Sequence, residues 1–422
     1  MILFSNGSEH HDLTDSDLKE GLYAALSKIG SRKRILLIPP DITRIHSRAG
    51  ELTAMAWNYY GDKVSDILPA LGTHKPMNSG ELDRMFPGLP HSLFRVHDWR
   101  NDITRLGEVP SDFISKVSDG ALNYIVPVEL NTLICNGKHD LILSLGQVVP
   151  HEVIGMANYN KNLLIGCGGP ESINKSHFLG AVFGMERMMG IADTPVRQVL
   201  NYASDHFLTH LPVVYVLTVL EQVSSSENQK EMATRGLFIG TSEDVFLAAA
   251  ALSAKVNNTK LDKPLEKVVV HLDPEEYRST WLGNKSIYRT RMAIANGGEL
   301  IVLAPGVKEF GEDPEIDRLI RKYGYHGTPA TLDAVKNNSD LNNNLSAAAH
   351  LIHGSSEGRF RITYCPGHLS KEEIENVGYE FGDLQSMENR FIYENLHDGY
   401  NHNSAGEEFY YISNPATGLW QT

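Results

Sequence analysis

The sequence has few of the features that mark several large classes of protein. Its 422 residues contain three cysteines, Cys135, Cys167 and Cys365, which are far apart and odd in number, so a disulfide framework and a paired-cysteine zinc site are excluded. It has no uninterrupted apolar stretch of about 18 residues, so no membrane-spanning helix is expected. The first residues lack the cationic and apolar regions of a signal peptide, and we therefore expect a cytoplasmic protein.

Positive charge is also scarce. Lysine and arginine number 38 against 52 aspartates and glutamates, which gives a formal net charge of -14. Proteins that bind nucleic acids normally carry a basic excess, and no basic stripe with interleaved aromatic residues is found. Neither a nucleic acid nor a membrane is therefore expected as a partner. An anionic substrate would have to meet specific local cations.

The composition is that of a globular protein, with 41% hydrophobic and 21% charged residues, and the length predicts two or three domains. Residues 34–40, 64–71 and 140–145 are short branched-aliphatic runs, each followed by polar residues. Such runs indicate buried parallel strands of an open α/β sheet, in which ligands bind at the carboxyl ends of the strands. The polar segment 255–267 indicates a domain boundary.

We predict two α/β domains with parallel-type sheets and an active site in the cleft between them. The N-terminal domain is expected to span residues 1–257 and to carry the cofactor and the acid/base residues. The C-terminal domain, residues 258–400, is expected to close over the substrate. Residues 401–422 are expected to pack back on the N-terminal domain.

The second domain has its own signals of secondary structure. Gly297-Gly298 is expected to end a helix, and the biased segment 336–346 to form an exposed loop. Ser370 and Glu373 have the spacing of a capping box and predict the start of a helix. Strands are expected at residues 268–272, 300–304 and 361–365.

Histidine is abundant, with eighteen residues, and most of these are expected to be structural or on the surface. Three of them, His74, His151 and His177, stand near strand ends or at the start of a helix. Zinc held by three imidazoles is one interpretation, and it would make the protein a zinc-dependent hydrolase. The three are separated by 77 and 26 residues, whereas tight metal sites usually take two ligands from close spacing.

Two polar or glycine-rich segments are candidate anion sites. Asp41 or Thr43 can cap the helix that follows the first strand, or Arg44 can hold a carboxylate or phosphate through two hydrogen bonds. The segment 166–169, Gly-Cys-Gly-Gly, can cradle a phosphate on backbone amides, although glycine clusters are usually turns.

The order and spacing of these motifs resemble the nickel-pincer lactate racemase family. The motifs are DxTR at 41–44, GTHxP at 72–76 and PHxxxG at 150–155, followed by a lysine ten residues after His151 and a histidine 26 residues after it. The resemblance covers nearly the whole chain. It implies a racemase or 2-epimerase of 2-hydroxy acids that works by reversible hydride transfer.

The resemblance also implies how the cofactor is bound. Lys161 would attach covalently to a nickel-pincer nucleotide, a pyridinium-3,5-dithiocarboxylic acid mononucleotide with Ni(II), and His177 would be the protein ligand of the nickel. Asp41 and Thr43 would hold the ribose-phosphate end. Cofactor-biosynthesis proteins are then expected as partners, because other proteins must make this group.

The substrate-binding residues follow from the same resemblance. His74 and His151 would be the two acid/base groups, one for each isomer, and histidine has a pKa near neutral pH. Arg44 and Lys285 would hold the carboxylate of the 2-hydroxy acid.

The sequence departs from the family at two places near the predicted site. The family commonly has a Gly-Ser-Gly-Gly type segment before the lysine, whereas residues 155–160 read Gly-Met-Ala-Asn-Tyr-Asn, and Leu282 stands where a glutamine is common. The added amide and hydroxyl groups could suit a sugar acid such as gluconate and its C2 epimer mannonate, or they could reflect local repacking. A non-catalytic carboxylate-binding protein is a further alternative.

Overall fold

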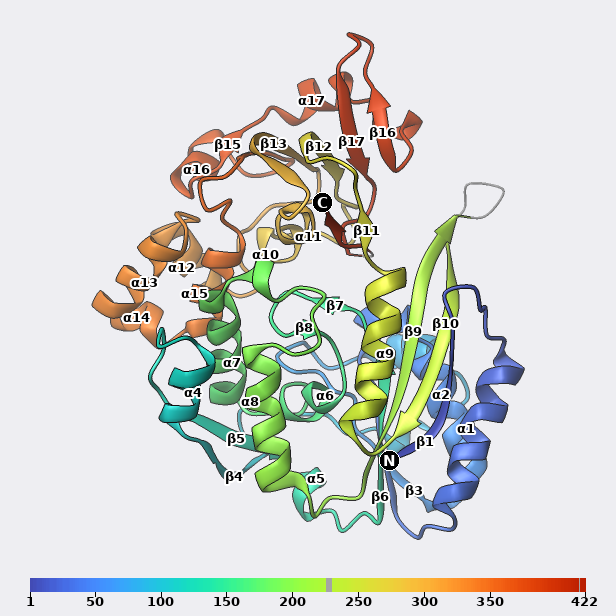
Figure 1. The fold of residues 1–422 in the computed structure, drawn as a ribbon. Helices are drawn as coiled ribbons and strands as arrows, with labels where there is room; N and C mark the ends of the chain where they lie inside the picture. Colours follow the sequence, from blue (N-terminus) through green and yellow to red (C-terminus); the bar gives the residue numbers. More distant parts are fainter. Residues whose placement is uncertain (225–229, 417) are drawn as a thin grey trace. The chain divides into compact units, whose positions relative to one another are not determined.

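The computed structural model describes residues 1–224, 230–416 and 418–422 (Figure 1). The chain divides into two compact units. The first consists of Met1–Leu179 and Met188–Asn257, and the second of Gly180–Arg187 and Asn258–Thr422. Among the described residues, no helix combines the length and the apolar character needed to cross a lipid bilayer.

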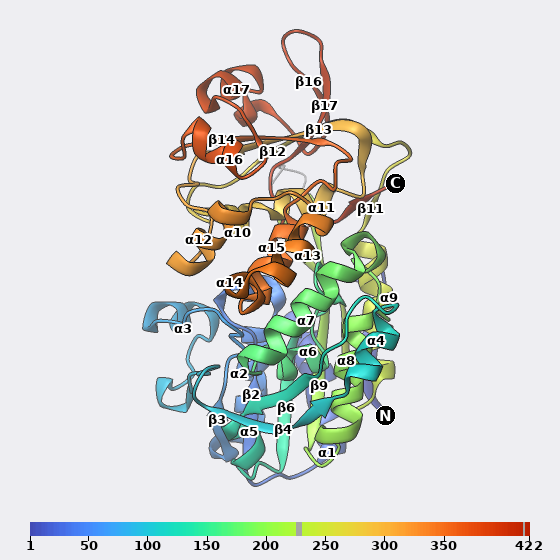
Figure 2. The ribbon, with the colours of Figure 1, turned by 90° about the vertical axis from the view of Figure 1, so that its left-hand side faces the viewer.

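The first unit is built on a six-stranded sheet with the order β1-β10-β9-β6-β2-β3. Strands β9, β6, β2 and β3, labelled in Figure 2, run parallel to one another. Strands β1 and β10 are antiparallel to their neighbours (Figure 1). This confirms the predicted α/β fold with a parallel sheet. The strands are β1 (Ile2–Gly7), β2 (Ile35–Ile38), β3 (Val64–Ile67), β6 (Leu141–Gln147), β9 (Val213–Ser224) and β10 (Lys230–Gly240).

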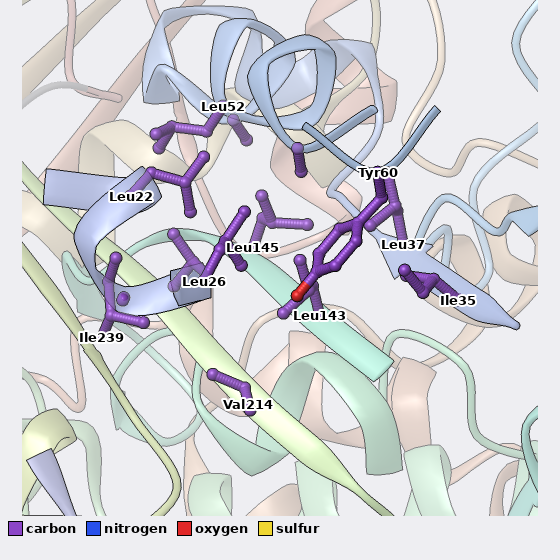
Figure 3. Packing of buried hydrophobic residues seen from close by; sticks show 14 of the residues in the cluster. Leu22, Leu26, Ile35, Leu37, Leu52, Tyr60, Leu143, Leu145, Val214 and Ile239 are labelled. Carbon is purple, nitrogen blue, oxygen red and sulfur yellow. The ribbon is translucent and has the colours of Figure 1, made fainter. Parts of the chain in front are cut away.

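A hydrophobic core fills one face of this sheet, beneath α1 (Asp15–Ile29) and α2 (Ala49–Tyr60). A capping box between Thr14 and Asp17 starts α1. Figure 3 shows leucines of both helices packed against strand residues such as Leu143 and Val214.

The opposite face of the sheet is covered differently. Side chains alternate along a strand, so Tyr215, next to Val214 on β9, faces away from that core. Its ring lies against Tyr159, which also stacks on Phe246 of α9 (Glu243–Val256). The segment that precedes Lys161 is therefore packed on this second face.

The remaining elements of the first unit are short. The additional strands are β4 (Ile103–Val109), β5 (Val126–Asn131), β7 (Pro150–His151) and β8 (Gly155–Met156). The helices are η1 (Ile42–Ser47), η2 (Gly61–Lys63), α3 (Ser79–Met85), η3 (His91–Leu93), α4 (Ser111–Val117), α5 (Thr132–Asn136), α6 (Asn160–Leu164), α7 (Pro170–Phe183), α8 (Pro195–Ala203) and the π-helix η5 (Ser204–Leu208).

The second unit contains another six-stranded sheet, with the order β15-β14-β13-β12-β17-β16, parallel except for β16. Residues 401–422 belong to this unit, in which β17 pairs with β12. Their packing on the N-terminal domain stays a prediction. Strands β11 (Thr259–Lys260) and β18 (Trp420–Gln421) form a separate two-stranded sheet. The six strands of the larger sheet are β12 (Leu265–His271), β13 (Ile294–Ala304), β14 (Arg361–Pro366), β15 (Glu380–Phe381), β16 (Gly399–His402) and β17 (Glu408–Ile412).

Two sequence predictions for this unit are wrong, and one is confirmed. Gly297-Gly298 does not end a helix but lies inside β13, where the pairing register with β12 shifts, as glycines at a β-bulge do. Segment 336–346 is largely helical. It contains the end of the helix Thr328–Asn337, the whole of Ser339–Asn342 and the start of Leu345–His353, which Asn344 caps with its side chain. The capping box of Ser370 and Glu373 is present.

The helices of the second unit follow the same chain order. They are η4 (Met185–Arg187), α10 (Thr280–Gly283), α11 (Lys285–Thr290), α12 (Pro314–Tyr323), α13 (Thr328–Asn337), α14 (Ser339–Asn342), α15 (Leu345–His353), α16 (Lys371–Asn376), α17 (Leu384–Arg390) and η6 (Tyr393–Asn395).

The packing of the first core predicts a stability difference between two leucines. Leu143 on β6 is fully buried, whereas Leu247 on α9 is 42% exposed. Leu143→Ala should lower the free energy of unfolding by about 2–5 kcal/mol through lost burial and a cavity. Leu247→Ala should change it by less than about 0.5 kcal/mol. Urea unfolding followed by circular dichroism measures both, and equal losses would contradict the core described here.

Candidate active site

The predicted site residues of the first unit follow neighbouring parallel strands. Asp41 comes directly after β2, His74 follows β3, and His151 on β7 follows β6. Because β6, β2 and β3 are parallel and adjacent, their carboxyl ends lie at one edge of the sheet. The sheet topology therefore brings these three segments to one side of the unit.

Asp41 orients His74. Its carboxylate lies 2.6 Å from Nδ1 of His74 and also accepts a hydrogen bond from the backbone N–H of Thr43, which caps η1. Burial raises the pKa of Asp41, but hydrogen bonds from His74 and Thr43 and the charge of Arg44 outweigh this and lower it. An ionised carboxylate thus fixes the imidazole through Nδ1 and leaves Nε2 available for proton transfer.

His151 is held in one neutral tautomer. Its Nδ1 accepts a hydrogen bond of 3.1 Å from the N–H of Val153, so the ring proton of the neutral form resides on Nε2. Burial lowers the pKa of His151 well below its usual value, and the charges of Lys161 and Arg44 act in the same direction. His151 is therefore neutral at physiological pH.

Lys161, on α6, has an activated amine. Among the described residues no side chain forms a hydrogen bond or ion pair with its Nζ. Burial and the positive charge of Arg44, with a smaller effect of Arg197, lower the pKa of Lys161 to about 8, and the charge of Glu152 opposes them. An unpaired lysine with a lowered pKa is partly neutral near physiological pH and can act as a nucleophile.

His177, on α7, has the form of a metal ligand. Its Nδ1–H donates to the backbone oxygen of Ile173 at 2.7 Å, which leaves the lone pair of Nε2 free. Burial and the charge of Lys161 lower the pKa of His177 to about 4, so the ring stays neutral. Histidines that bind metals typically donate their other ring N–H to a carbonyl in this way.

These two residues fit the nickel nucleotide that the resemblance implies. That group needs one histidine nitrogen and one lysine amine from the protein, and His177 and Lys161 offer both in mutual electrostatic reach. A zinc site would need three protein ligands together. Within the part of the chain that the structure describes, no three histidine, cysteine, aspartate or glutamate side chains form such a group.

Two charged residues of the site were missed by the sequence analysis. The carboxylate of Glu152 opposes the lowering of the pKa of His151, Lys161 and His177, and lies 3.9 Å from Nδ1 of His151. Its position beside His151 in an otherwise apolar segment was the available signal. Arg197 on α8 is far away in sequence, and no local pattern marks it.

The glycine-rich segment 166–169 has a packing role. A Cβ at Gly166 or Gly168 would lie 2.4 Å or 1.9 Å from backbone oxygens of α6, and one at Gly169 would lie 2.1 Å from the carboxylate of Glu129. A carboxylate at this position disfavours a phosphate there. Cys167 is fully buried and burial raises the pKa of its thiol, so it is not an activated nucleophile.

The other predicted residues stay predictions in their assigned roles. Thr43 has an exposed side chain beside Asp41, and Arg44 is partly buried, with no hydrogen bond from its guanidinium to a described residue. Lys285 lies in the second unit on α11, with Nζ 5.8 Å from the ring centre of Tyr277. Leu282 lies on the neighbouring α10.

The first unit resembles a known domain in sequence. Residues 23–189 match the family model of the lactate racemase N-terminal domain. This segment includes every predicted site residue from Asp41 to His177. The matched segment is therefore similar to the N-terminal domain of lactate racemases. The resemblance predicted from the motifs is confirmed over these residues, and it supports a racemase-type function.

Solved structures share the fold over nearly the whole length of the chain. A protein from Thermotoga maritima shares 24% sequence identity and a TM-score of 0.81, with 99% of each chain covered. The lactate racemase apoprotein from Thermoanaerobacterium thermosaccharolyticum shares 17% identity and a TM-score of 0.68, covering 100% of this chain and 94% of that one. No curated protein matches the sequence.

The contact between Asp41 and His74 predicts a dependence of stability on pH. The pKa of Asp41 is lowered in the folded protein, so its stabilisation is present above the unfolded pKa of about 3.9 and is lost as the pH falls below it. Asp41→Asn should cost about 1.5–3 kcal/mol at pH 7.

Chemical denaturation at pH 7 and at lower pH values checks this expectation. The difference between the wild type and Asp41→Asn should shrink below about pH 4. Asp83→Asn is the control, since Asp83 is 72% exposed and also contacts a histidine, His91. A difference that stays constant with pH would contradict the ionised state of Asp41.

Proposed function

We propose that the protein is a racemase or 2-epimerase of 2-hydroxy acids that uses a nickel-pincer nucleotide attached to Lys161. The proposal depends on two residues that occur together in the first unit. Lys161 has an amine without a hydrogen-bond partner among the described residues and a pKa of about 8, and His177 is neutral with a free lone pair on Nε2. His177 is in the neutral state that metal ligation requires, and part of Lys161 is in the neutral amine form that covalent attachment requires.

The residues of the chain have separate tasks in this proposal. When bound, the nickel nucleotide supplies an acceptor for hydride from C2 of the substrate. His74, through Nε2, takes up and returns the hydroxyl proton of one isomer, and His151 that of the other, because the hydroxyl lies on different sides in the two isomers. To accept a proton at Nε2, His151 has to release the N–H of Val153 and carry its own ring proton on Nδ1. Arg44 holds the substrate carboxylate in an otherwise acidic protein, and Lys285 of the second unit is proposed as the second cation.

The surroundings of Lys161 bear on the size of the substrate. The side chain of Asn160 is fully buried and is used in hydrogen bonds to Arg197, Asn201 and Ser204. The amide oxygen of Asn158 accepts a hydrogen bond from the next backbone N–H. The use of these amides within the protein favours local repacking over contact with a sugar acid. Lactate and malate are therefore the first substrates to test, and gluconate and mannonate should be tested beside them.

The anchoring role of Lys161 predicts a difference between two variants. In protein produced together with the cofactor-making enzymes, Lys161→Ala should carry no covalently bound nucleotide. His177→Ala should keep the covalent nucleotide and lose nickel, because its lone pair is the proposed protein ligand. Intact mass and metal analysis measure both.

The control for these variants is Lys138→Ala, because Lys138 is an exposed lysine of the same unit. It should keep both the nucleotide and the nickel. A nucleotide on Lys161→Ala, or wild-type protein without any mass increment, would contradict the proposal. Unchanged nickel in His177→Ala would remove this residue from the ligand set.

The two acid/base histidines predict a loss in both directions of the reaction. A full turnover needs both, so His74→Ala and His151→Ala should each slow conversion of either isomer by at least ~10²-fold. Both variants should retain nickel and nucleotide. The assay uses a 2-hydroxy acid that is deuterated at C2. The two isomers are separated after the reaction, and their deuterium content is measured by mass spectrometry.

The label distinguishes two ways of breaking the C2–H bond. If hydrogen leaves C2 as hydride, most deuterium should remain at C2 of the opposite isomer. Complete exchange with water would indicate removal as a proton and would sink the proposed mechanism. His206→Ala is the matched control: His206 is exposed, stacks on Tyr202 and should leave activity unchanged.

A further inference from the structure

The backbone immediately before Lys161 is strained. Asn158 and Tyr159 both have positive φ angles, 66° and 60°. Tyr159 combines its φ with a ψ of -135°, a region that is readily open only to glycine. Consecutive residues of this kind persist only where the surrounding structure enforces them, and such strain is concentrated at functional sites.

Arg197 is the residue that holds this turn. Its side chain is fully buried, and Nη2 donates to the backbone oxygens of Met156, at 2.7 Å, and Asn158, at 3.2 Å. Nη1 donates to the side-chain oxygen of Asn160. One planar guanidinium therefore ties together three residues of a five-residue stretch, which an ammonium group could not do with the same geometry.

Aromatic rings close the other side of the clamp. The guanidinium of Arg197 lies 4.2 Å from the ring centre of Phe246. The ring of Tyr159 lies 5.3 Å from the same phenylalanine and 4.4 Å from Tyr215. A Cβ at Gly146 would lie 2.2 Å from the amide nitrogen of Asn158, so that position must remain glycine.

The residues on both sides of Lys161 are pinned by side-chain hydrogen bonds. Asn160 bonds to Arg197 and also, through its amide N–H groups, to Asn201 and Ser204. Asn162 donates to the backbone oxygen of Ile38, at the end of β2, and to Ser144 and Leu145 within β6. Lys161 itself makes no such bond to a described residue, so the fixed backbone presents an unpaired amine.

We propose that Arg197 is a positioning residue for Lys161: by clamping the strained Asn158-Tyr159 turn, it keeps the lysine amine available for covalent attachment. What becomes attached rests on the proposed function, but the presentation of the amine does not. The positive charge of Arg197 also contributes to lowering the pKa of Lys161, after burial and Arg44.

The test uses the protein without cofactor. Acetic anhydride is added over a range of pH, and acetylation of Lys161 is measured by peptide mass spectrometry relative to the exposed Lys138 of the same sample. In the wild type, the reactivity of Lys161 should rise with a midpoint near pH 8. In Arg197→Met, its reactivity at pH 8 relative to Lys138 should fall about tenfold, because the released turn no longer presents the amine.

Two further variants separate positioning from charge and from general stability. Arg197→Lys keeps the charge but cannot bond to all three partners, so most of the loss should remain. Adding Tyr159→Gly to Arg197→Met should restore reactivity, because glycine adopts the turn conformation without a clamp. If Arg197→Met does not fold, Arg197→Lys takes its place, with the same loss and the same rescue expected.

Unchanged relative reactivity of Lys161 in a folded Arg197 variant would overturn the proposal, whatever its melting temperature. Failure of Tyr159→Gly to restore reactivity would also overturn it. A reactive, clamped Lys161 in protein that never acquires a nucleotide would instead contradict the proposed function alone.

Discussion

The burial of positive charge around Lys161 is the constraint on which the site depends. The positive charges of Arg44 and Arg197 act on Lys161, and burial makes the ionised forms of Lys161 and Arg197 costly. Burial and the neighbouring positive charges lower the pKa of Lys161, and they also lower the pKa values of His151 and His177, so that both imidazoles stay neutral. The same arrangement therefore yields a nucleophilic amine, a free metal-binding nitrogen and a neutral imidazole, while Glu152 limits the excess of positive charge.

The parallel sheet makes this concentration of groups possible without a long continuous motif. Asp41 and His74 follow adjacent strands, and Asn162 anchors α6 to the end of β2 and to residues within β6 through three hydrogen bonds. Lys161 is consequently fixed relative to these strands, although the site residues of this unit span more than a hundred positions of the chain. The side of the sheet that carries α9 supports the turn before Lys161, and the side beneath α1 and α2 supplies the main core.

Sequence reasoning succeeded where a local signal determines the structure. The branched-aliphatic runs predicted β2, β3 and β6, because a strand buried on both faces needs such residues. It failed for Gly297-Gly298, since glycines mark bulges as well as helix ends. It did not give the pairing of β17 with β12, since the two strands are more than a hundred residues apart. In the candidate site, Asp41, His74 and His177 were predicted from the family motifs, and their roles stay predictions. Arg197 was not, because its partners are backbone oxygens, which carry no sequence signature.

The departure before Lys161 shows why a missing glycine is not evidence of a lost function. Positive φ angles occur at Asn158 and Tyr159, although neither residue adopts them readily. A buried guanidinium and two aromatic rings enforce the conformation that glycine would adopt freely. The polar side chains of this turn are used in its own hydrogen bonds, so their polarity says more about the support of the turn than about the substrate. Long-range contacts can therefore hold a backbone conformation beside the lysine that the local sequence does not favour.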